Sequence, residues 1–218
     1  EGRMVSLGDR IAEIVERNRA VFDPHETRMA ALVDTIGQVA HRPQPGDEAP
    51  DFALPTAGGK LARMADLAGP RGLVLLFIRG LWCPYCNAQM VAFEERADGF
   101  AEAGLAVAVV TPEIGGRAAR TKALLGLSAE VLCDVDEGMA LSYGCLLPLP
   151  REERVFLRAV GYDLAALYGN EGWFMPMASI FVIGTDGRVA AVLGGADQRR
   201  RPDPDAVLQA AGQRPSGS

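Results

Sequence analysis

Apolar side chains recur at helical spacing from Leu7 to Val39 and are interrupted at Asp23-Pro24. The recurring positions are Ile11, Ile14, Val15, Met29, Leu32, Val33 and Ile36. This spacing predicts a helical hairpin that breaks at the proline. We interpret the hairpin as an extension that packs its apolar stripe on the main domain, with a dimer arm or a lid as the alternative.

The stretch from His41 to Pro50 contains three prolines and a glycine, so it cannot continue a helix. We interpret this stretch as a linker. The sequence therefore predicts a helical extension and linker over residues 1–43, one main domain over residues 44–212 and a loose tail over residues 213–218.

After the linker the hydrophobic period changes from that of a helix to that of strands. Two short segments, Asp51–Leu54 and Lys60–Leu61, flank Gly58-Gly59 and predict a hairpin. Leu73–Ile78 is a continuous apolar run, which is typical of a central strand covered on both faces.

The next segments alternate between helical and strand patterns. A helix is predicted from Pro84 to about Ala103, a strand over Leu105–Val110 and a helix over Gly116–Leu125. Strand, helix, strand, helix is the order of a βαβ unit with parallel strands.

The C-terminal part predicts antiparallel pairing. Ile180–Ile183 and Arg188–Leu193 are joined by Asp186-Gly187, a strong hairpin turn. A last helix is predicted from about Pro204 to Ala211. The fold class is therefore α/β, with a central mixed sheet flanked by helices and an N-terminal helical extension.

Composition narrows the classes of protein. The chain has 218 residues, of which 49% are hydrophobic and 23% charged, as in a globular protein with a sizeable core. The balance of 22 Lys+Arg against 28 Asp+Glu gives 22 − 28 = −6, a poor match for nucleic acid. No apolar run reaches the roughly 20 residues of a membrane span, and Glu1–Leu7 lacks an export signal, so we expect a cytoplasmic protein.

The four cysteines are too few for a disulfide scaffold, but two of them form the motif Cys83-Pro84-Tyr85-Cys86 directly after the buried strand. A helix that begins there lowers the pKa of a thiol at its N-terminus, and Pro84 suits the first helical turn. Residues three apart lie on one side of a helix, so the two sulfurs can form and break a disulfide. We expect Cys83 to be the more exposed, attacking thiolate and Cys86 to resolve the mixed intermediate.

Other roles for the cysteines are less favoured. A structural zinc site would need a second pair, and Cys133 and Cys145 are twelve residues apart in different elements. A purely structural disulfide is uncommon in a cytoplasmic protein. We interpret Cys133 and Cys145 as small buried hydrophobic residues.

At these residues the sequence resembles a known family. The resemblance covers roughly residues 44–212 and is to the peroxiredoxin-like branch of the thioredoxin superfamily, the alkyl hydroperoxide reductase and thiol-specific antioxidant group. The matching stretches are Gly46–Leu54, Leu67–Gly69, Phe77–Cys86, Thr111–Glu113, Asp134–Asp136, Trp173 and Phe181–Ile183.

The resemblance implies a thioredoxin-like fold and a redox enzyme that performs thiol–disulfide exchange, thiol-dependent reduction of peroxides, or both. It implies thioredoxin or a small thiol as reductant and a peroxide or a disulfide as substrate. No flavin, haem or nicotinamide site is visible in the sequence, and no cofactor is expected. The N-terminal helices are a candidate homodimer contact, and a redox-inert binding module that kept the fold is the alternative function.

The active-site motif departs from that of peroxiredoxins, which carry Pro-x-x-x-Thr-x-x-Cys. Aligned on Phe77, the motif falls on Arg79, Cys83 and Cys86, so Arg replaces Pro and Cys replaces Thr. Cys86 then takes the peroxidatic place. If this alignment governs, the roles of the two cysteines exchange and Cys86 is the residue oxidised to sulfenic acid.

Two supporting groups of the superfamily are absent from their usual positions. Thioredoxins have a cis-proline just before the strand that begins near Phe181, and peroxiredoxins have an Arg at nearly the same position. In this sequence that position is Ala178, and Pro176, two residues earlier, is a candidate replacement for the proline. Phe77 stands where thioredoxins hold a buried carboxylate. Glu113, at the carboxyl edge of the sheet, is the candidate proton carrier, with a solvated loop carboxylate as the alternative.

The remaining candidates surround the motif. Arg79 can stabilise a thiolate or contact substrate, or pair with a surface acid. Trp82 and Trp173 are candidate walls of an apolar groove around the sulfurs, with packing as the alternative for Trp173. We interpret Arg199–Arg201 as a solvated run. His25 and His41 are isolated, without metal-ligand spacing.

Overall fold

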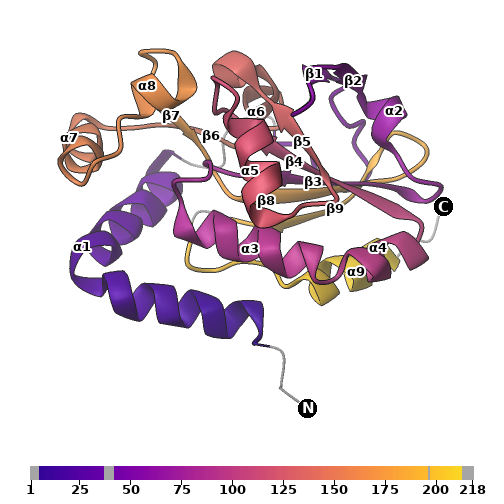
Figure 1. Ribbon diagram of the computed structural model, residues 1–218, viewed down its shortest axis with the longest axis horizontal. Helices are drawn as coiled ribbons and strands as arrows, with labels where there is room; N and C mark the ends of the chain where they lie inside the picture. Colours follow the sequence, from indigo (N-terminus) through magenta and orange to yellow (C-terminus); the bar gives the residue numbers. More distant parts are fainter. Residues whose placement is uncertain (1–4, 37–41, 196, 213–218) are drawn as a thin grey trace.

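The computed structural model describes residues 5–36, 42–195 and 197–212, and its centre is a sheet with the strand order β5-β4-β3-β8-β9 (Figure 1). The strands are β1 (Ala53–Pro55), β2 (Leu61–Arg63), β3 (Gly72–Phe77), β4 (Leu105–Thr111), β5 (Glu130–Cys133), β6 (Leu146–Pro148), β7 (Phe174–Pro176), β8 (Ser179–Ile183) and β9 (Val189–Gly194). The helices are α1 (Leu7–Ile36), α2 (Met64–Leu67), α3 (Pro84–Glu94), α4 (Ala97–Glu102), α5 (Arg117–Leu125), the 3-10 turn η1 (Val135–Glu137), α6 (Gly138–Ser142), α7 (Arg151–Ala159), α8 (Leu164–Tyr168) and α9 (Pro204–Gly212).

The central sheet is mixed, as the sequence predicts. β3 pairs in parallel with β4, and β4 in parallel with β5, whereas β8 is antiparallel to both β3 and β9. All six residues of β3 are buried, because this central strand is covered on both faces. The hairpin of β1 and β2 and the hairpin of β8 and β9 are both confirmed.

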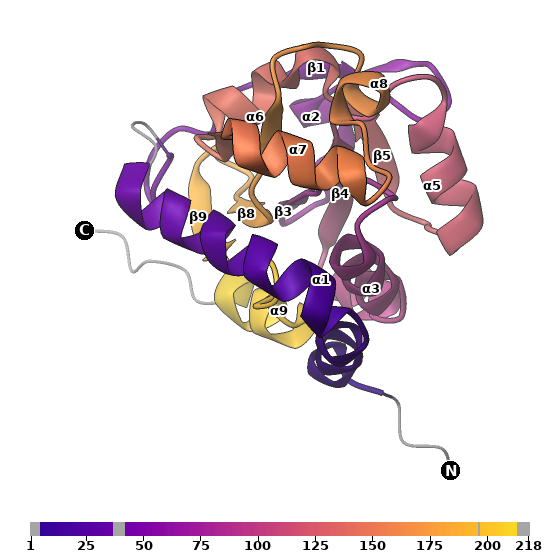
Figure 2. The same cartoon turned by 90° about the vertical axis from the view of Figure 1, so that its left-hand side faces the viewer.

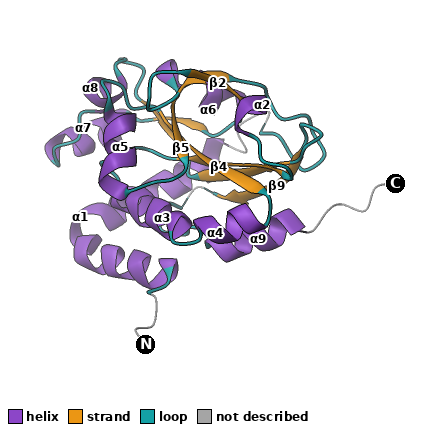
Figure 3. Cartoon of the chain, turned by 45° about the vertical axis from the view of Figure 1, so that its right-hand side comes forward, coloured by secondary structure: helices purple, strands orange, loops and turns teal. Residues whose placement is uncertain are grey.

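Alternation along β3 divides the core between the two faces of the sheet. Leu73, Leu75 and Phe77 face one cluster, which also holds residues of α6, α7 and α8. Val74 and Leu76 face the other, with residues of α3, α4, α5 and α9. Figure 3 shows α3, α4 and α9 together on this second side of the sheet.

The N-terminal extension differs from the predicted hairpin. The structure has one helix of 30 residues, α1, with Pro24 inside it, and Figure 1 shows two arms of this helix that meet at a sharp bend. A proline inside a helix removes one hydrogen bond and kinks it, but need not end it. Leu7 and Ile11 pack into the cluster of α3, and Figure 2 shows α1 passing between α7 and α9.

Two other segments differ from the sequence prediction. The helix predicted from Pro84 to Ala103 is divided into α3 and α4. Most of residues 130–176 form short elements, from β5 to β7, that the hydrophobic pattern does not predict. In the described part of the chain, no helix is long and apolar enough to cross a membrane. The predicted boundaries at residues 43 and 212 stay predictions, and the predicted tail lies outside the described residues.

Candidate active site

The cysteine motif lies where β3 gives way to α3, as predicted. Cys83 is the residue that caps the N-terminus of α3, and Pro84 is the first helical residue. The loop before it is held by two hydrogen bonds: the Cys83 N–H donates to the Gly80 carbonyl (3.2 Å) and Asn87 Nδ2 donates to the Leu81 carbonyl (2.8 Å). This geometry fixes both sulfurs at the beginning of the helix.

Both sulfurs are buried and both cysteines are free thiols. The exposed fraction is 1% for Cys83 and 0% for Cys86. The sequence predicts Cys83 to be the more exposed of the two, but neither cysteine is open to solvent, and the difference between them is negligible. α1 contributes to this burial, because Leu7 and Ile11 belong to the same apolar cluster as both cysteines.

Hydrogen-bond donors converge on Cys86. The backbone N–H of Arg79 and the guanidinium Nη2 of Arg201 each lie 3.4 Å from the Cys86 sulfur. The neighbouring Cys83 thiol also favours the charged form of Cys86. Two hydrogen-bond donors and the charges of Arg79 and Arg201 therefore favour the thiolate form of Cys86.

The pKa values of the two thiols are pushed apart. Burial raises the pKa of Cys86, but the hydrogen bond from Cys83 and the charges of Arg201 and Arg79 outweigh it, so the pKa lies well below that of a free thiol. Burial, together with the proximity of Cys86, raises the pKa of Cys83. The lowered pKa that the sequence predicts for Cys83 is found instead for Cys86.

Arg79 is the buried centre of the site's charge network. Its guanidinium forms two hydrogen bonds with the carboxylate of Glu26 on α1, of 2.7 and 3.0 Å. The exposed fraction of the two side chains is 2% and 1%. One of the predicted roles of Arg79 is an ion pair with a surface acid. Arg79 does form an ion pair, but its partner is Glu26, a buried acid of the N-terminal extension. Sequence reasoning missed Glu26, whose place three residues before Met29 puts a charge on the apolar face of its helix.

The arginine run before α9 is not a solvated run, which corrects the sequence prediction. Arg201 reaches Cys86 and donates a second hydrogen bond to Gln89 of α3 (2.7 Å). Arg199 pairs with Asp197 and with Asp23 of α1. Of the three arginines, only Arg200 is largely exposed, with its Nε 4.0 Å from the Asp197 carboxylate.

Glu113 is buried beneath the loop that precedes the cysteines. Its carboxylate accepts a hydrogen bond from the Leu81 N–H (2.9 Å), and it lies so close to Gly80 that a side chain there would collide with it. Burial raises the pKa of Glu113, although the Leu81 N–H and the charges of Arg117 and Arg120 oppose the shift. It is therefore not a solvated loop carboxylate, which was the alternative.

Aromatic side chains support the same loop. Trp82 Nε1 and the Tyr168 hydroxyl both donate to the Arg79 carbonyl, at 3.2 and 2.7 Å. Trp82 also packs on Tyr162, with ring centroids 4.9 Å apart. Tyr85 is buried beside the cysteines, and burial raises its pKa to about 12. Trp82 and Tyr85 thus lie at the site, as the sequence predicts.

Trp173 and Pro176 lie on the opposite side of the sheet from the cysteines. Trp173 packs in the cluster of α6, α7 and α8, under the guanidinium of Arg158, which is 4.5 Å from its ring. Pro176 belongs to β7, which pairs with β6, and no cis peptide bond occurs among the described residues. Ala178, at the position expected for the cis-proline, directly precedes Ser179, which pairs with Phe77 at the end of β3. The groove walled by two tryptophans is not formed.

The remaining described residues that the sequence singles out lie outside the immediate surroundings of the two cysteines. Phe77 packs against Tyr143 and Phe181 in the apolar core. His25 is not isolated, because its ring contacts Glu153 of α7. Cys145 is buried, as expected, and Cys133 is half-buried. His41 lies outside the described residues, which contain no group of His, Cys, Asp and Glu suited to a metal ion.

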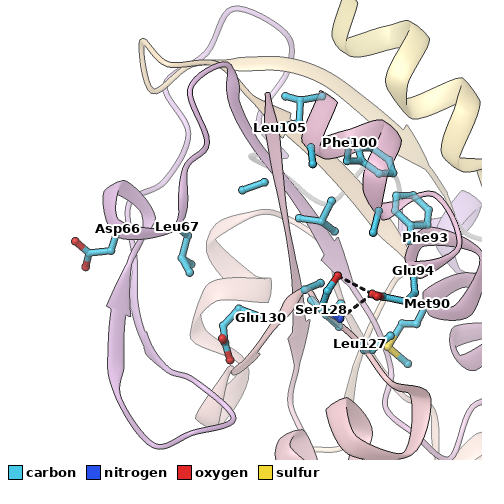
Figure 4. A pocket seen from close by; sticks show the side chains of 16 residues that line it. Asp66, Leu67, Met90, Phe93, Glu94, Phe100, Leu105, Leu127, Ser128 and Glu130 are labelled. Atoms are coloured by element: carbon cyan, nitrogen blue, oxygen red, sulfur yellow. Dashed lines mark hydrogen bonds between the residues drawn. The ribbon is translucent and has the colours of Figure 1, made fainter. Parts of the chain in front are cut away.

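Three cavities bear on the site. One, lined by Leu81, Trp82 and Glu113, adjoins the loop before Cys83. Another is lined by Arg201 with Arg200 and Pro202, on the side of Cys86. A more enclosed one, shown in Figure 4, lies at the far end of α3, where Met90 and Phe93 line it, and it includes neither cysteine of the motif.

A mixed sheet with a Cys-x-x-Cys motif at its central strand-to-helix turn is the arrangement of the thioredoxin-like fold class. The chain belongs to the AhpC/TSA family, whose model matches residues 45–192. Two Mycobacterium tuberculosis proteins named as candidate peroxiredoxins, MT2597 and Rv2521, are 32% identical over 100 residues, which is 46% of this chain and 63% of theirs. The chain thus aligns with less than two thirds of these relatives.

Solved structures show the same fold. Peroxidoxin BcpB from Mycobacterium tuberculosis superposes with a TM-score of 0.61 at 22% identity, covering 78% of this chain and 97% of that one. Peroxiredoxin Q from Xanthomonas campestris superposes with a TM-score of 0.55 at 19% identity, covering 74% and 89%. The thioredoxin-like fold class is therefore confirmed.

Proposed function

We propose that the protein is a thiol-dependent peroxidase in which Cys86 attacks the peroxide and Cys83 resolves the product. The observation that carries this assignment is the convergence of the Arg79 N–H and the Arg201 guanidinium on the Cys86 sulfur, each at 3.4 Å. It favours the exchange of roles that the peroxiredoxin motif implies when aligned on Phe77. Membership of the AhpC/TSA family supports peroxide as the substrate.

The first step forms a sulfur–oxygen bond. The Cys86 thiolate attacks one peroxide oxygen, the O–O bond breaks, and the second oxygen leaves as an alcohol or water after taking a proton. Arg201 lines an open cavity and touches the sulfur, so it is placed to bind the peroxide on the Cys86 side. Glu113 is the proposed proton carrier, because it is buried against the loop before the cysteines and burial raises its pKa.

The second step consumes the sulfenic acid. The Cys83 thiol attacks the Cys86 sulfur, water leaves, and a Cys83–Cys86 disulfide forms. The hydrogen bond between the two thiols indicates that the sulfurs are neighbours before oxidation. A thiol reductant, which is thioredoxin or a small thiol, then restores the dithiol with two electrons.

Burial of both sulfurs favours a small peroxide over a protein disulfide as the substrate, because a disulfide needs one sulfur at the surface. The charge network on Cys86 argues against a redox-inert binding module, since an inert thiol needs no stabilised anion. Homodimer formation and a cytoplasmic location stay predictions. The apolar stripe of α1 packs within its own chain in this structure.

The test is hydrogen peroxide consumption with a thiol donor by Cys83→Ser and Cys86→Ser, with Cys133→Ser as the matched control. Cys86→Ser is expected to lower the rate by at least about 1000-fold, because no thiolate remains to attack. Cys83→Ser is expected to consume one equivalent of peroxide and to accumulate a sulfenic acid that a diketone reagent traps on Cys86. Trapping on Cys83 in the Cys86→Ser variant would reverse the assignment, and full activity in both variants would exclude a dithiol peroxidase.

A further inference from the structure

The cavity beside Cys83 has the walls of a small-molecule site. It has a volume of about 440 Å³ and lies between the loop before α3, the N-terminal turns of α5 and the α7–α8 connection. Its apolar walls are Leu81, Trp82, Tyr162 and Leu167. A wall of aromatic and aliphatic side chains with a few charged groups is typical of small-ligand sites.

The charged groups of this cavity are two arginines and two acids, and both acids already have partners, Glu113 in the Leu81 N–H and Asp163 in Arg158. Arg117 and Arg120 line it, and neither has a carboxylate within ion-pair distance in the described part of the chain. Arg117 makes one long hydrogen bond, to the Ile114 carbonyl (3.3 Å). Asp163, also in the lining, is paired with Arg158 at 3.5 Å. An organic anion is therefore the ligand that the cavity suits.

The cavity meets the cysteine motif at the loop that leads into Cys83, and neither cysteine is part of its lining. Trp82, which directly precedes Cys83, forms part of the wall, whereas Cys86 is contacted by Arg201 from the cavity on its other side. In a Cys83–Cys86 disulfide, the sulfur with the lower thiol pKa is the better leaving group. A reducing thiol should therefore attack Cys83 and expel Cys86 as thiolate.

We propose that this cavity binds the reductant, a low-molecular-weight thiol that carries a carboxylate. Arg117 and Arg120 hold the carboxylate, and the aromatic wall holds the carbon chain. The inference rests on the Cys83–Cys86 disulfide of the proposed function. The incoming thiolate bonds to the Cys83 sulfur, the Cys83–Cys86 bond breaks, and Cys86 leaves as thiolate. A second thiol then attacks the mixed disulfide, so that two thiols become one disulfide and Cys83 regains a thiol.

The test separates reduction from peroxide chemistry by starting from protein oxidised with diamide. Reduction of the Cys83–Cys86 disulfide is followed by acid quenching, alkylation and peptide mass spectrometry, with 3-mercaptopropionate as the anionic thiol, 2-mercaptoethanol as the neutral one and cysteamine as the cationic one. Rates are compared per concentration of thiolate. We expect the anionic thiol to react about tenfold faster than the neutral one at low ionic strength, and the advantage to fall as salt is added.

The variant Arg117→Gln/Arg120→Gln is expected to abolish this preference while the neutral thiol keeps its rate. Lys60→Gln/Arg151→Gln removes the same charge from exposed sites outside the cavity and is the matched control, which should keep the preference. Equal rates for anionic and neutral thiols in the unmodified protein would overturn the proposal. So would a preference that survives in the Arg117/Arg120 variant.

Two further outcomes are informative. If thioredoxin reduces the disulfide at micromolar concentration and none of the small thiols shows saturation, the cavity is not the reductant site. If diamide fails to link Cys83 to Cys86, both this proposal and the resolving step of the proposed function are wrong. A disulfide that forms without any preference for the anionic thiol contradicts the cavity assignment alone.

Discussion

The two flanks of the family segment supply opposite charges near the cysteines: Glu26 pairs with Arg79, and Arg201 contacts Cys86. Glu26 comes from α1, and Arg201 comes from the segment before α9. Both lie outside residues 45–192, which match the AhpC/TSA family, whereas Arg79 and both cysteines lie inside them. The family segment therefore provides the sulfurs, and its flanks provide part of the charge that acts on them.

The two flanks act in different ways. Glu26 is fully buried and both of its carboxylate oxygens are used by Arg79, so it holds a charge that would otherwise be unpaired in the core. Arg201 is only partly buried, touches the Cys86 sulfur and lines an open cavity. The comparison teaches that the N-terminal flank supports the site from within the core, whereas the C-terminal flank lines the cavity where we propose that the peroxide binds.

The largest effect is expected from Glu26→Ala. Removing one partner of a buried ion pair leaves the Arg79 guanidinium unpaired, so the free energy of unfolding should fall by about 3–5 kcal/mol. Urea unfolding measures this change. Glu13→Ala, which breaks an exposed pair with Arg17, is the matched control and should change stability by less than about 0.5 kcal/mol. A loss below about 1 kcal/mol for Glu26→Ala would mean that the N-terminal flank does not support the site.

The next effect is expected from Arg201→Gln and concerns reactivity. Loss of a cation next to the thiolate favours the thiol, so the pKa of Cys86 should rise, and the rate of alkylation below that pKa should fall several-fold. The rate of alkylation of the normal protein should decrease as the pH falls through the pKa of Cys86. In the variant this transition should move to higher pH.

The conservative variant Arg201→Lys tests whether charge is the cause. Lysine keeps the positive charge, so it should restore part of the shift, even though it cannot reproduce the hydrogen bond to Gln89 in the same geometry. An unchanged pH profile in Arg201→Gln would show that Arg79 and Cys83 alone stabilise the thiolate.

The smallest effect is expected from Arg199→Gln. Arg199 joins the two flanks directly, because it pairs with Asp23 of α1 as well as with Asp197, but it touches neither cysteine. Ion pairs that are partly open to solvent contribute about 1 kcal/mol or less. We therefore expect a small loss of stability in urea and an unchanged pH profile of Cys86 alkylation. A shifted profile would show that the flanks act on the sulfurs together.

The central fold could be predicted because its signals are local. The apolar run that ends at Ile78, the βαβ order and the Asp186-Gly187 turn each lie within a few residues, and they give β3, β4, β8 and β9. The elements between β5 and β7 are only three to nine residues long and carry no clear period. Tertiary packing, not local pattern, determines such short elements.

The site could be predicted only in part for the same reason. Cys83, Cys86, Arg79 and Trp82 are neighbours in sequence, so their proximity follows from the chain itself. The Glu26–Arg79 pair joins residues 53 apart, and the Arg201–Cys86 contact joins residues 115 apart. No spacing rule relates such residues, and the relative pKa of the two thiols depends on them.

The two tryptophans have different surroundings, so the intrinsic fluorescence of the protein can distinguish the region of the cysteines from the rest of the core. Trp82 directly precedes Cys83, and its indole N–H donates to the Arg79 carbonyl, whereas Trp173 lies across the sheet beneath Arg158. These are the only two tryptophans in the chain. Because Trp82 adjoins the dithiol, whereas Trp173 belongs to the cluster on the other side of the sheet, we expect oxidation of the cysteines to change the fluorescence of Trp82 more than that of Trp173.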